Sequence, residues 1–174
     1  FLQLREKALD DSAFLTEAME LQALCREYHV PFIVNDNVEI AVRMGADGVH
    51  VGQSDIPVEV CRRYLGDDAI VGLSARAHEM RAYIATADMG LVDYLGVGPL
   101  HETATKPDCG MDDDGRVITR DFEELADLAR ISPRPIVVGG GVKAADIPAL
   151  ARAGVAGFFV VSAVCAADDP RAAA

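Results

Sequence analysis

Residues 31–53, PFIVNDNVEIAVRMGADGVHVGQ, contain two short apolar runs, PFIVND (31–36) and DGVHVGQ (47–53). Each run is nearly continuous in apolar residues, which is typical of a strand buried on both faces of a parallel sheet. Each run also leads into polar residues, Asn35 and Asp36 after the first and Gly52 to Asp55 after the second. This stretch therefore predicts two parallel strands whose carboxyl ends carry polar groups.

The same pattern recurs along the rest of the chain. Four more apolar runs follow, each ending in a polar or glycine cluster: AIVGLS (69–74), DYLGVG (93–98), PIVVGGG (135–141) and GFFVVSA (157–163). Amphipathic segments with helical spacing lie between runs, such as Phe14, Ala18, Leu21, Cys25 and Tyr28 before the first run and Phe122, Leu125 and Leu128 before the fifth. Ligands bind at the carboxyl edge of parallel strands in such α/β proteins. The pattern predicts a (β/α)8 TIM barrel, with a doubly wound parallel sheet as the alternative.

The first seven residues, FLQLREK, add one more candidate strand and bring the number to seven. We therefore expect residues 1–174 to form a single barrel domain that lacks its first strand and helix and its last helix. The strand period of two places Gln3, Arg5 and Lys7 on one side and the two leucines on the other. A solvated edge strand would show the same alternation. A closed barrel has no edge, however, and inward cations are stable only beside an anion, so we expect a phosphorylated ligand.

Composition limits the possible partners. The chain has 174 residues, 51% of them apolar, and a formal net charge of -12. Such a charge argues against a nucleic-acid partner, because phosphate backbones are bound by an excess of Lys and Arg. No apolar run approaches the roughly 20 residues that cross a bilayer, and FLQLREK does not resemble a signal peptide. We expect a cytoplasmic protein with no membrane partner.

Asp36 and Asp55 follow two consecutive predicted strands. Taken singly, each has a structural explanation, because Asp36 could cap a helix starting near Val38 and Asp55 precedes Pro57, where N-caps are common. Taken together beside a cationic cluster, two carboxylates are what Mg²⁺ uses to hold a diphosphate, with water and phosphate oxygens completing its coordination. The pair predicts a magnesium site.

Two more segments indicate phosphate binding. The glycine run 139–141 exposes backbone N–H groups at a strand end, and Ser162 lies at the end of the following strand. The loops after the last two strands of such barrels frequently form a phosphate site. A tight strand-to-helix turn is the simpler reading of the glycines alone. Beside Ser162, a phosphate site is the better prediction.

The long segment from about Pro99 to Thr119 is long enough to be functional or mobile. It carries Lys106, one of only three lysines in the chain, and an acidic run, Asp112 to Asp114, that we expect to be a solvated loop. The four cysteines are scattered, which indicates reduced, buried thiols rather than a zinc or disulfide framework. The four histidines show no metal-ligand spacing, so none is assigned a role.

The chain resembles the thiamine phosphate synthase family. The resemblance runs almost end to end through short motifs in the family's order and spacing: QLREK, PFIVND, ADGVHVGQSD, VGLS, DYLGVGP, TATK, VVGGGV and VVSAV. It implies a (β/α)8 barrel that uses Mg²⁺ to join 4-amino-2-methyl-5-hydroxymethylpyrimidine diphosphate to 4-methyl-5-(2-phosphoethyl)thiazole. The products would be thiamine phosphate and pyrophosphate.

The resemblance also implies the roles of individual residues. The pyrimidine diphosphate would be bound by Gln3, Leu4, Arg5, Glu6, Lys7, Asn35, Ser74 and Lys106. The thiazole phosphate would be bound by Thr103, Ala104, Thr105, Gly141, Val161 and Ser162. Catalytic roles would fall to Lys106, Arg5, Lys7 and Ser74, and Asp36 and Asp55 would hold Mg²⁺. Lys106 would neutralise the diphosphate while the threonines beside it hold the other substrate's phosphate, so that one loop serves both.

The sequence departs from the family pattern in a few places. Arg76 stands where the family usually has a histidine, and Asp146 lies near the position of a frequent asparagine. The related thiazole tautomerase and a non-catalytic domain that senses thiazole phosphate or thiamine phosphate are the alternative functions. The diphosphate-binding set argues against the tautomerase. A homo-oligomer, or a fusion to another enzyme of thiamine synthesis, would be compatible with the sequence.

Overall fold

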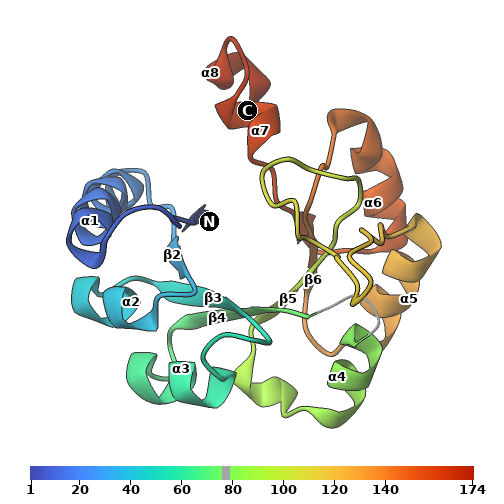
Figure 1. Cartoon of the computed structure of the whole chain (residues 1–174), viewed down its shortest axis with the longest axis horizontal. Coiled ribbons are helices and arrows are strands. Elements are labelled where there is room, and N and C mark those ends of the chain that lie inside the picture. The colour runs from blue at the N-terminus through green and yellow to red at the C-terminus, as the bar shows by residue number, and fades with distance from the viewer. Residues whose placement is uncertain (76–78) are drawn as a thin grey trace. The chain divides into compact units, whose positions relative to one another are not determined.

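The computed structural model describes residues 1–75 and 79–174. The chain divides into two compact units (Figure 1). Unit 1 comprises residues 1–74 and 90–93, and unit 2 comprises residues 75–89 and 94–174. Each unit is described by itself below.

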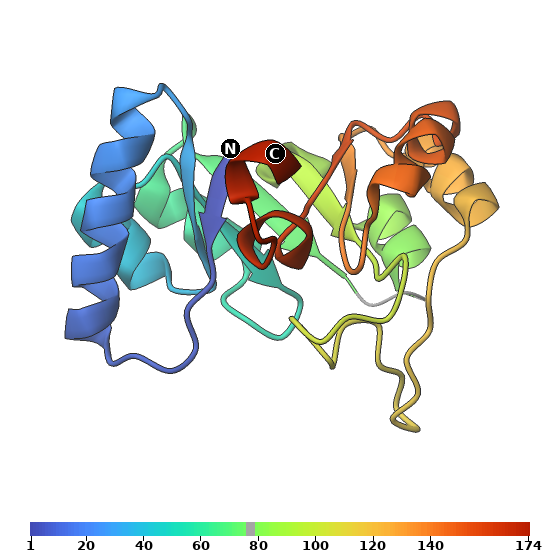
Figure 2. The same cartoon turned by 90° about the horizontal axis from the view of Figure 1, so that it is seen from above.

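Unit 1 alternates strands and helices, as the apolar runs predict. Its elements are β1 (Leu2–Leu4), α1 (Asp11–Glu27), β2 (Phe32–Asn35), α2 (Val38–Met44), β3 (Gly48–Gly52), α3 (Val58–Leu65) and β4 (Ile70–Ser74). All four strands are parallel, and each pairs with the next one in sequence. In Figure 2 the loop after β1 (blue) and the loop after β3 (cyan to green) lie along the same lower edge of this unit. Unit 1 therefore presents its strand ends on one side.

Unit 2 continues the alternation. Its strands and its α-helices are α4 (Met80–Thr86), β5 (Tyr94–Val97), α5 (Phe122–Ile131), β6 (Ile136–Val138), α6 (Ile147–Ala153), β7 (Gly157–Phe158), α7 (Ser162–Cys165) and α8 (Pro170–Ala173). Two short 3-10 helices, η1 (Met89–Leu91), whose last two residues belong to unit 1, and η2 (Ala144–Asp146), precede β5 and α6. The strands pair in parallel, β5 with β6 and β6 with β7. Every apolar run of the sequence thus contains a strand.

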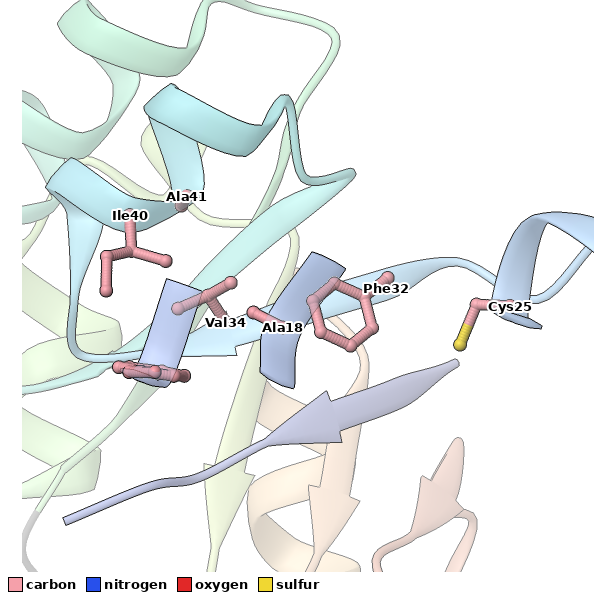
Figure 3. Close-up of a cluster of buried hydrophobic side chains, with 7 residues drawn as sticks. Ala18, Cys25, Phe32, Val34, Ile40 and Ala41 are labelled. Carbon is pink, nitrogen blue, oxygen red and sulfur yellow. The ribbon is translucent and has the colours of Figure 1, made fainter. Parts of the chain in front are cut away.

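A hydrophobic cluster holds the helices of unit 1 against its strands (Figure 3). Phe32 and Val34 of β2 lie on the same strand face, where they meet buried side chains of α1 and α2: Phe14, Ala18, Cys25, Ile40 and Ala41. Fully burying a side chain such as Phe32 contributes roughly 1.5–3 kcal/mol. The remaining face of β2, which carries Asn35, is thereby turned away from the helices.

The first strand is shorter than its alternation suggests. It ends at Leu4, so Arg5 and Lys7 lie in the following loop rather than in a strand. The Glu6 side chain explains this, because its Oε1 accepts hydrogen bonds from the N–H groups of Lys7 (2.7 Å), Ala8 and Leu9 (3.1 Å). The N–H groups of Ala8, Leu9 and Lys7 hold the pKa of Glu6 below its usual value. The carboxylate therefore closes a turn where the strand would have continued.

The acidic run of the long loop is more ordered than a simple solvated loop. Met111 and Val117 form an antiparallel bridge. Asp112 Oδ1 accepts hydrogen bonds from the N–H groups of Asp114 (3.0 Å) and Arg116 (2.8 Å). The run is a tight turn closed by its own first carboxylate.

No described helix is long and apolar enough to span a membrane.

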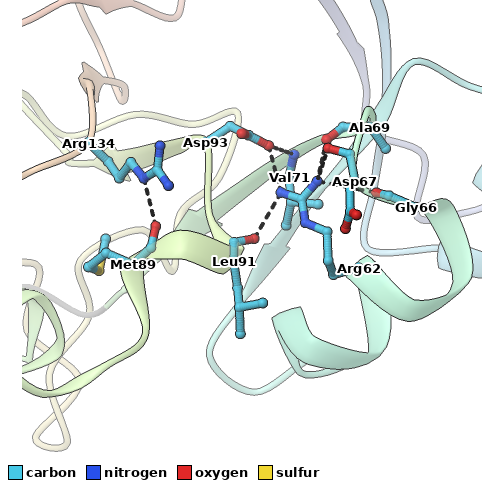
Figure 4. A network of polar contacts seen from close by, with 9 residues as sticks. All are labelled: Arg62, Gly66, Asp67, Ala69, Val71, Met89, Leu91, Asp93 and Arg134. Carbon is cyan, nitrogen blue, oxygen red and sulfur yellow. Dashed lines mark hydrogen bonds and ion pairs between the residues drawn. The ribbon is translucent and has the colours of Figure 1, made fainter.

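A largely buried arginine joins the chain segments at the amino end of β4 (Figure 4). Arg62 of α3 donates to the carbonyls of Gly66 (3.3 Å), Asp67 (3.2 Å), Ala69 (2.6 Å) and Leu91 (3.0 Å), and to Asp93 Oδ2 (2.8 Å). Asp93 Oδ2 also accepts the N–H of Val71 (2.7 Å). In unit 2, Arg134 Nε donates to the Met89 carbonyl (2.6 Å) in a smaller contact. These arginines satisfy carbonyls that the turns leave unpaired.

Replacing Arg62 tests this anchor. We expect Arg62→Ala to lower the free energy of unfolding by about 2 kcal/mol, because the turn carbonyls lose a largely buried charged donor. The control Arg43→Ala removes an exposed arginine 3.8 Å from Glu39 on α2 and should cost less than about 0.5 kcal/mol. Urea denaturation of both variants is the measurement. Equal losses would show that Arg62 is not the anchor.

Candidate active site

Strand register places four polar side chains of unit 1 on one face of its sheet. Asn35 of β2 is in register with His50 of β3, and Gly52, two residues further along β3, is in register with Ser74 of β4. Gln3 of β1 is in register with Ile33, two residues before Asn35. Because paired residues of parallel strands share a face, and so do residues two apart, these four belong to the face turned away from the helices.

His50 is a site residue that the sequence analysis missed. Its Nε2 lies 2.8 Å from the Ser74 hydroxyl, and the His50 residue is buried. The signal was present in the strand, where Gly48, His50 and Gly52 alternate with Val49 and Val51. His50 therefore lies on the same face of β3 as Gly48 and Gly52, which is the face of the predicted site. It fixes the hydroxyl of a residue that the family resemblance places at the pyrimidine diphosphate.

Gln3 carries an unsatisfied donor. Its Nε2 is buried and has no hydrogen-bond partner in the described part of the chain. Leaving a buried donor unpaired costs roughly 1–3 kcal/mol. The next residue, Leu4, instead packs against the hydrophobic cluster, so only its backbone could contact a ligand on the face of Gln3. The orphaned amide is what a ligand with a hydrogen-bond acceptor would satisfy.

Asp36 does not cap the helix that follows it. Asn37 is the N-cap of α2, and its Oδ1 accepts the N–H of Ile40 (3.0 Å). Asp36 itself has a left-handed φ of 62° and donates its own N–H to the His50 carbonyl (2.8 Å). Its Oδ2 forms an ion pair with Lys7. The capping alternative is therefore wrong for Asp36.

Asp55 does not cap a helix either. The N-cap of α3 is Pro57, which has no side-chain cap bond. Asp55 Oδ2 instead accepts the N–H of Gly52 (2.8 Å) and so closes the turn after β3. A side chain at Gly52 would bring Cβ to 3.0 Å from this carboxylate. Both aspartates thus sit at carboxyl ends of neighbouring strands for reasons other than capping.

The donor set of these aspartates fits Mg²⁺. Each one uses Oδ2 for a protein contact, which leaves Oδ1 for a ligand. Within residues 1–75 and 79–174 there is no group of three or more His, Cys, Asp or Glu that could hold a metal. Magnesium needs no such group, because it is commonly held by one or two carboxylates, waters and phosphate oxygens. Arg5 and Lys7 are exposed in the loop after β1, where they can face an anionic ligand.

In unit 2 the loops after β5 and β6 are in backbone contact. A Cβ at Gly98 would lie 2.4 Å from the Gly139 carbonyl oxygen, and one at Gly140 would lie 2.5 Å from the Pro99 Cβ. Gly140 and Gly141 also have left-handed φ values of 78° and 70°. Their carbonyl and N–H groups are set by this contact. The N–H groups of Gly140 and Gly141 form no hydrogen bond with another described residue, so they are available to a phosphate.

The other predicted residues of unit 2 are exposed or line a cavity. A cavity of about 330 Å³ is lined by Glu102, Thr103, Ala104, Pro107, Cys109 and Val117. Thr103 Oγ1 accepts the N–H of Thr105 (3.3 Å), which curls the segment, and Lys106 is exposed beside it. Val161 and Ser162 are exposed at the start of α7. Arg76, the departure from the family pattern, lies outside the described residues.

None of the four cysteines, all of which lie in the described part of the chain, is in a disulfide, and two of them are buried rather than all four. Burial raises the pKa of the Cys25 and Cys61 thiols. Cys109 is half-buried and Cys165 is exposed.

Comparison with known proteins first gives the class of the protein. The described chain superimposes on a thiamine phosphate pyrophosphorylase from Pyrococcus furiosus with a TM-score of 0.79 and 31% identity, covering 98% of this chain and 77% of that one. This match confirms the TIM-barrel fold class. The sequence pattern of the thiamine monophosphate synthase family matches residues 1–164. The chain belongs to this family, as the motifs indicated.

Two relatives show how much of a longer protein the chain spans. It is 41% identical over 172 residues to the thiamine-phosphate synthase of Thermosynechococcus vestitus, covering 98% of this chain and 46% of that protein. It is 42% identical over 174 residues to the thiamine biosynthesis bifunctional protein ThiM/ThiE of Symbiobacterium thermophilum, covering 99% of this chain and 34% of that protein. The chain thus spans less than half the length of these curated relatives.

A capping test separates the roles of Asp36 and Asn37. We expect Asn37→Ala to lower the free energy of unfolding by about 1 kcal/mol through loss of the helix cap. Asp36→Asn should cost about 0.5 kcal/mol or less, because it removes only a partly exposed ion pair and asparagine tolerates a positive φ. Thermal or urea unfolding measures both. A larger loss for Asp36→Asn would return the structural role to Asp36.

Proposed function

We propose that the protein catalyses the Mg²⁺-dependent joining of 4-amino-2-methyl-5-hydroxymethylpyrimidine diphosphate to 4-methyl-5-(2-phosphoethyl)thiazole, which makes it a transferase that yields thiamine phosphate and pyrophosphate. The observation that carries the proposal is the polar face of unit 1. It gathers Gln3, Asn35, His50 and Ser74 beside two strand-end aspartates that cap no helix. Family membership supplies the reaction.

In this proposal the residues of unit 1 bind the pyrimidine diphosphate. The orphaned Gln3 amide donates to the pyrimidine, and Asn35 and the Ser74 hydroxyl, held by His50, complete the polar contacts. Asp36 and Asp55 hold Mg²⁺, which when bound neutralises charge on the diphosphate. Arg5 and Lys7 add positive charge to the same leaving group. Glu6 shapes the loop that carries both cations, since its Oε1 is used by backbone N–H groups.

The residues of unit 2 bind the second substrate. The hydroxyls of Thr103 and Thr105, the backbone of Ala104 and the N–H of Gly141 receive the phosphate of the thiazole, together with the backbone at Val161 and Ser162. Lys106 neutralises the diphosphate of the first substrate. Backbone N–H groups and hydroxyls suit a phosphate because they are fixed donors that need no reorganisation.

The proposed reaction requires the protein mainly to stabilise the charge of the leaving diphosphate and to position the thiazole nitrogen. The C–O bond to the diphosphate breaks with its electron pair leaving on the diphosphate, and the neutral thiazole nitrogen attacks the carbon with its own lone pair. No proton has to be removed from the nucleophile, so no general base is required. This agrees with the position of His50, whose ring is engaged by the Ser74 hydroxyl.

The location and the partners follow from the same proposal. Both substrates are phosphorylated and would not cross a membrane unaided, so we propose a cytoplasmic location. The bifunctional relative supports a fusion to another enzyme of the same synthesis. A homo-oligomer is compatible with the proposal.

The activity is tested directly. Incubating the protein with both precursors and Mg²⁺ should release thiamine phosphate and pyrophosphate in equal amounts, detected by chromatography. Chelating Mg²⁺ with EDTA should abolish the reaction, because a diphosphate leaving group needs a cation. Added Mg²⁺ should restore it. Binding of both precursors without any product would instead favour a sensing domain.

Lys106 provides the sharpest test of a single residue. We expect Lys106→Ala to lower kcat/KM by about 10²–10³-fold, the range for losing one donor to a developing negative charge. Arg116→Ala is the matched control, because it removes an exposed cation from the same loop and should leave kcat/KM within about twofold. Steady-state kinetics distinguish the two. Similar values for both variants would remove Lys106 from the site.

A further inference from the structure

The loops after β5 and β6 of unit 2 are linked by a side-chain pair outside the predicted site. His101 Nε2 lies 3.0 Å from Asp146 Oδ2, and this same oxygen accepts the N–H of Lys143 (2.8 Å). The Asp146 side chain is 14% exposed and that of His101 is 40% exposed. The Asp146 carboxylate thus accepts a hydrogen bond within its own loop, after β6, and also contacts His101 in the loop after β5.

The pair acts where the two backbones are already in contact. The N–H of His101 donates to the Gly140 carbonyl (3.0 Å), and that of Leu100 donates to the same oxygen (3.0 Å). A Cβ at Gly141 would lie 2.8 Å from the His101 carbonyl oxygen and 2.9 Å from its Cβ. His101 therefore lies directly on Gly141, and Thr103 follows two residues later. Any movement of His101 moves the threonine segment relative to the glycine N–H groups.

The carboxylate keeps its charge in this setting. Burial opposes ionisation, but the N–H of Lys143 and the ring of His101 together hold the pKa of Asp146 below its usual value. Hydrogen bonds to an ionised acceptor are stronger than those between neutral groups. The departure from the family pattern at Asp146 thus has a defined partner in this chain.

We propose that His101 and Asp146 are a positioning pair that holds the Thr103–Thr105 segment against the Gly140–Gly141 backbone, so that both meet one phosphate of the substrate. The proposal rests on the proposed function for the identity of that substrate. Neither side chain needs to touch it. The pair affects binding of the thiazole phosphate more than binding of the pyrimidine diphosphate, because the residues proposed to bind the pyrimidine ring, Gln3, Asn35 and Ser74, belong to unit 1 and only Lys106 follows the threonine segment.

The test compares the two Michaelis constants in four variants. His101→Ala and Asp146→Ala should each raise the KM for the thiazole phosphate about tenfold, equivalent to about 1.4 kcal/mol, with a clearly smaller rise in the KM for the pyrimidine diphosphate. Asp146→Asn keeps an oxygen acceptor and should restore most of the affinity. Asp127→Ala is the control, because it removes a carboxylate paired with Arg81 and Arg130 in the same unit and should change neither KM.

The His101→Ala variant distinguishes the proposed positioning role of the pair from a purely local role of Asp146 in the turn before α6. It leaves the Asp146 contact with the Lys143 N–H intact, so an effect of Asp146→Ala alone would assign the carboxylate to the local turn and overturn the pair. An equal rise in both KM values would overturn it as well. If Asp146→Ala fails to fold, His101→Ala and Asp146→Asn still decide.

A second measurement needs no substrate. The amides of Leu100 and His101 should exchange with deuterium faster in His101→Ala and Asp146→Ala than in the wild type, because their bonds to the Gly140 carbonyl open more often. Unchanged exchange would overturn the pair even if the enzyme is active. If the wild-type protein made no thiamine phosphate while exchange were still faster in the two variants, the proposed function would be refuted and the pair would stand.

Discussion

The in-register pairing of parallel strands is the constraint on which the site depends. Each strand of unit 1 is bonded to the next with its carboxyl end in the same direction, so alternate side chains divide between two faces. The apolar set, including Phe32 and Val34, is buried under α1 and α2. Because a shift of one residue would exchange the faces, burying that set also fixes Asn35, His50 and Ser74 on the opposite face. The same strand register therefore buries the core and places the polar groups on the opposite face.

Polar groups at the amino ends of the strands stabilise the fold, and those at the carboxyl ends are available to the substrates. At the amino end of β4, Arg62 and Asp93 satisfy turn carbonyls and a strand N–H, although the buried Arg62 Nε has no hydrogen-bond partner among the described residues. At the carboxyl ends, within the described residues, the buried Gln3 Nε2 has no partner and Asp36 and Asp55 each use only Oδ2 for a side-chain contact. Polar groups that bind the turns at one edge and polar groups available to a ligand at the other are what α/β barrels show when function is confined to one face.

Sequence periodicity predicted the strands well, because an apolar run buried on both faces has few other structures available. It predicted the loops less well. The alternation in FLQLREK extended the strand to Lys7, but Glu6 binds three backbone N–H groups and ends it at Leu4. The capping role considered as an alternative for Asp36 belongs to Asn37, since either residue type can cap and only the backbone angles decide. His50 was missed because a single histidine in an apolar run carries no spacing signal, although its parity matched the flanking glycines.

A chain with a net charge of -12 and three lysines has to bind phosphate groups by local means. Its long-range field repels anions, but charges on the surface are screened beyond about 8 Å at physiological ionic strength. A direct contact between a cation or an N–H group and a phosphate acts within this distance, whereas the repulsion of distant carboxylates is screened. Clustering Arg5 and Lys7 in one turn and leaving the Gly140 and Gly141 N–H groups unpaired supplies such contacts with few cations. The acidic surface then raises the importance of loop placement, because an anion displaced from these donors meets a repulsive field rather than another binding site.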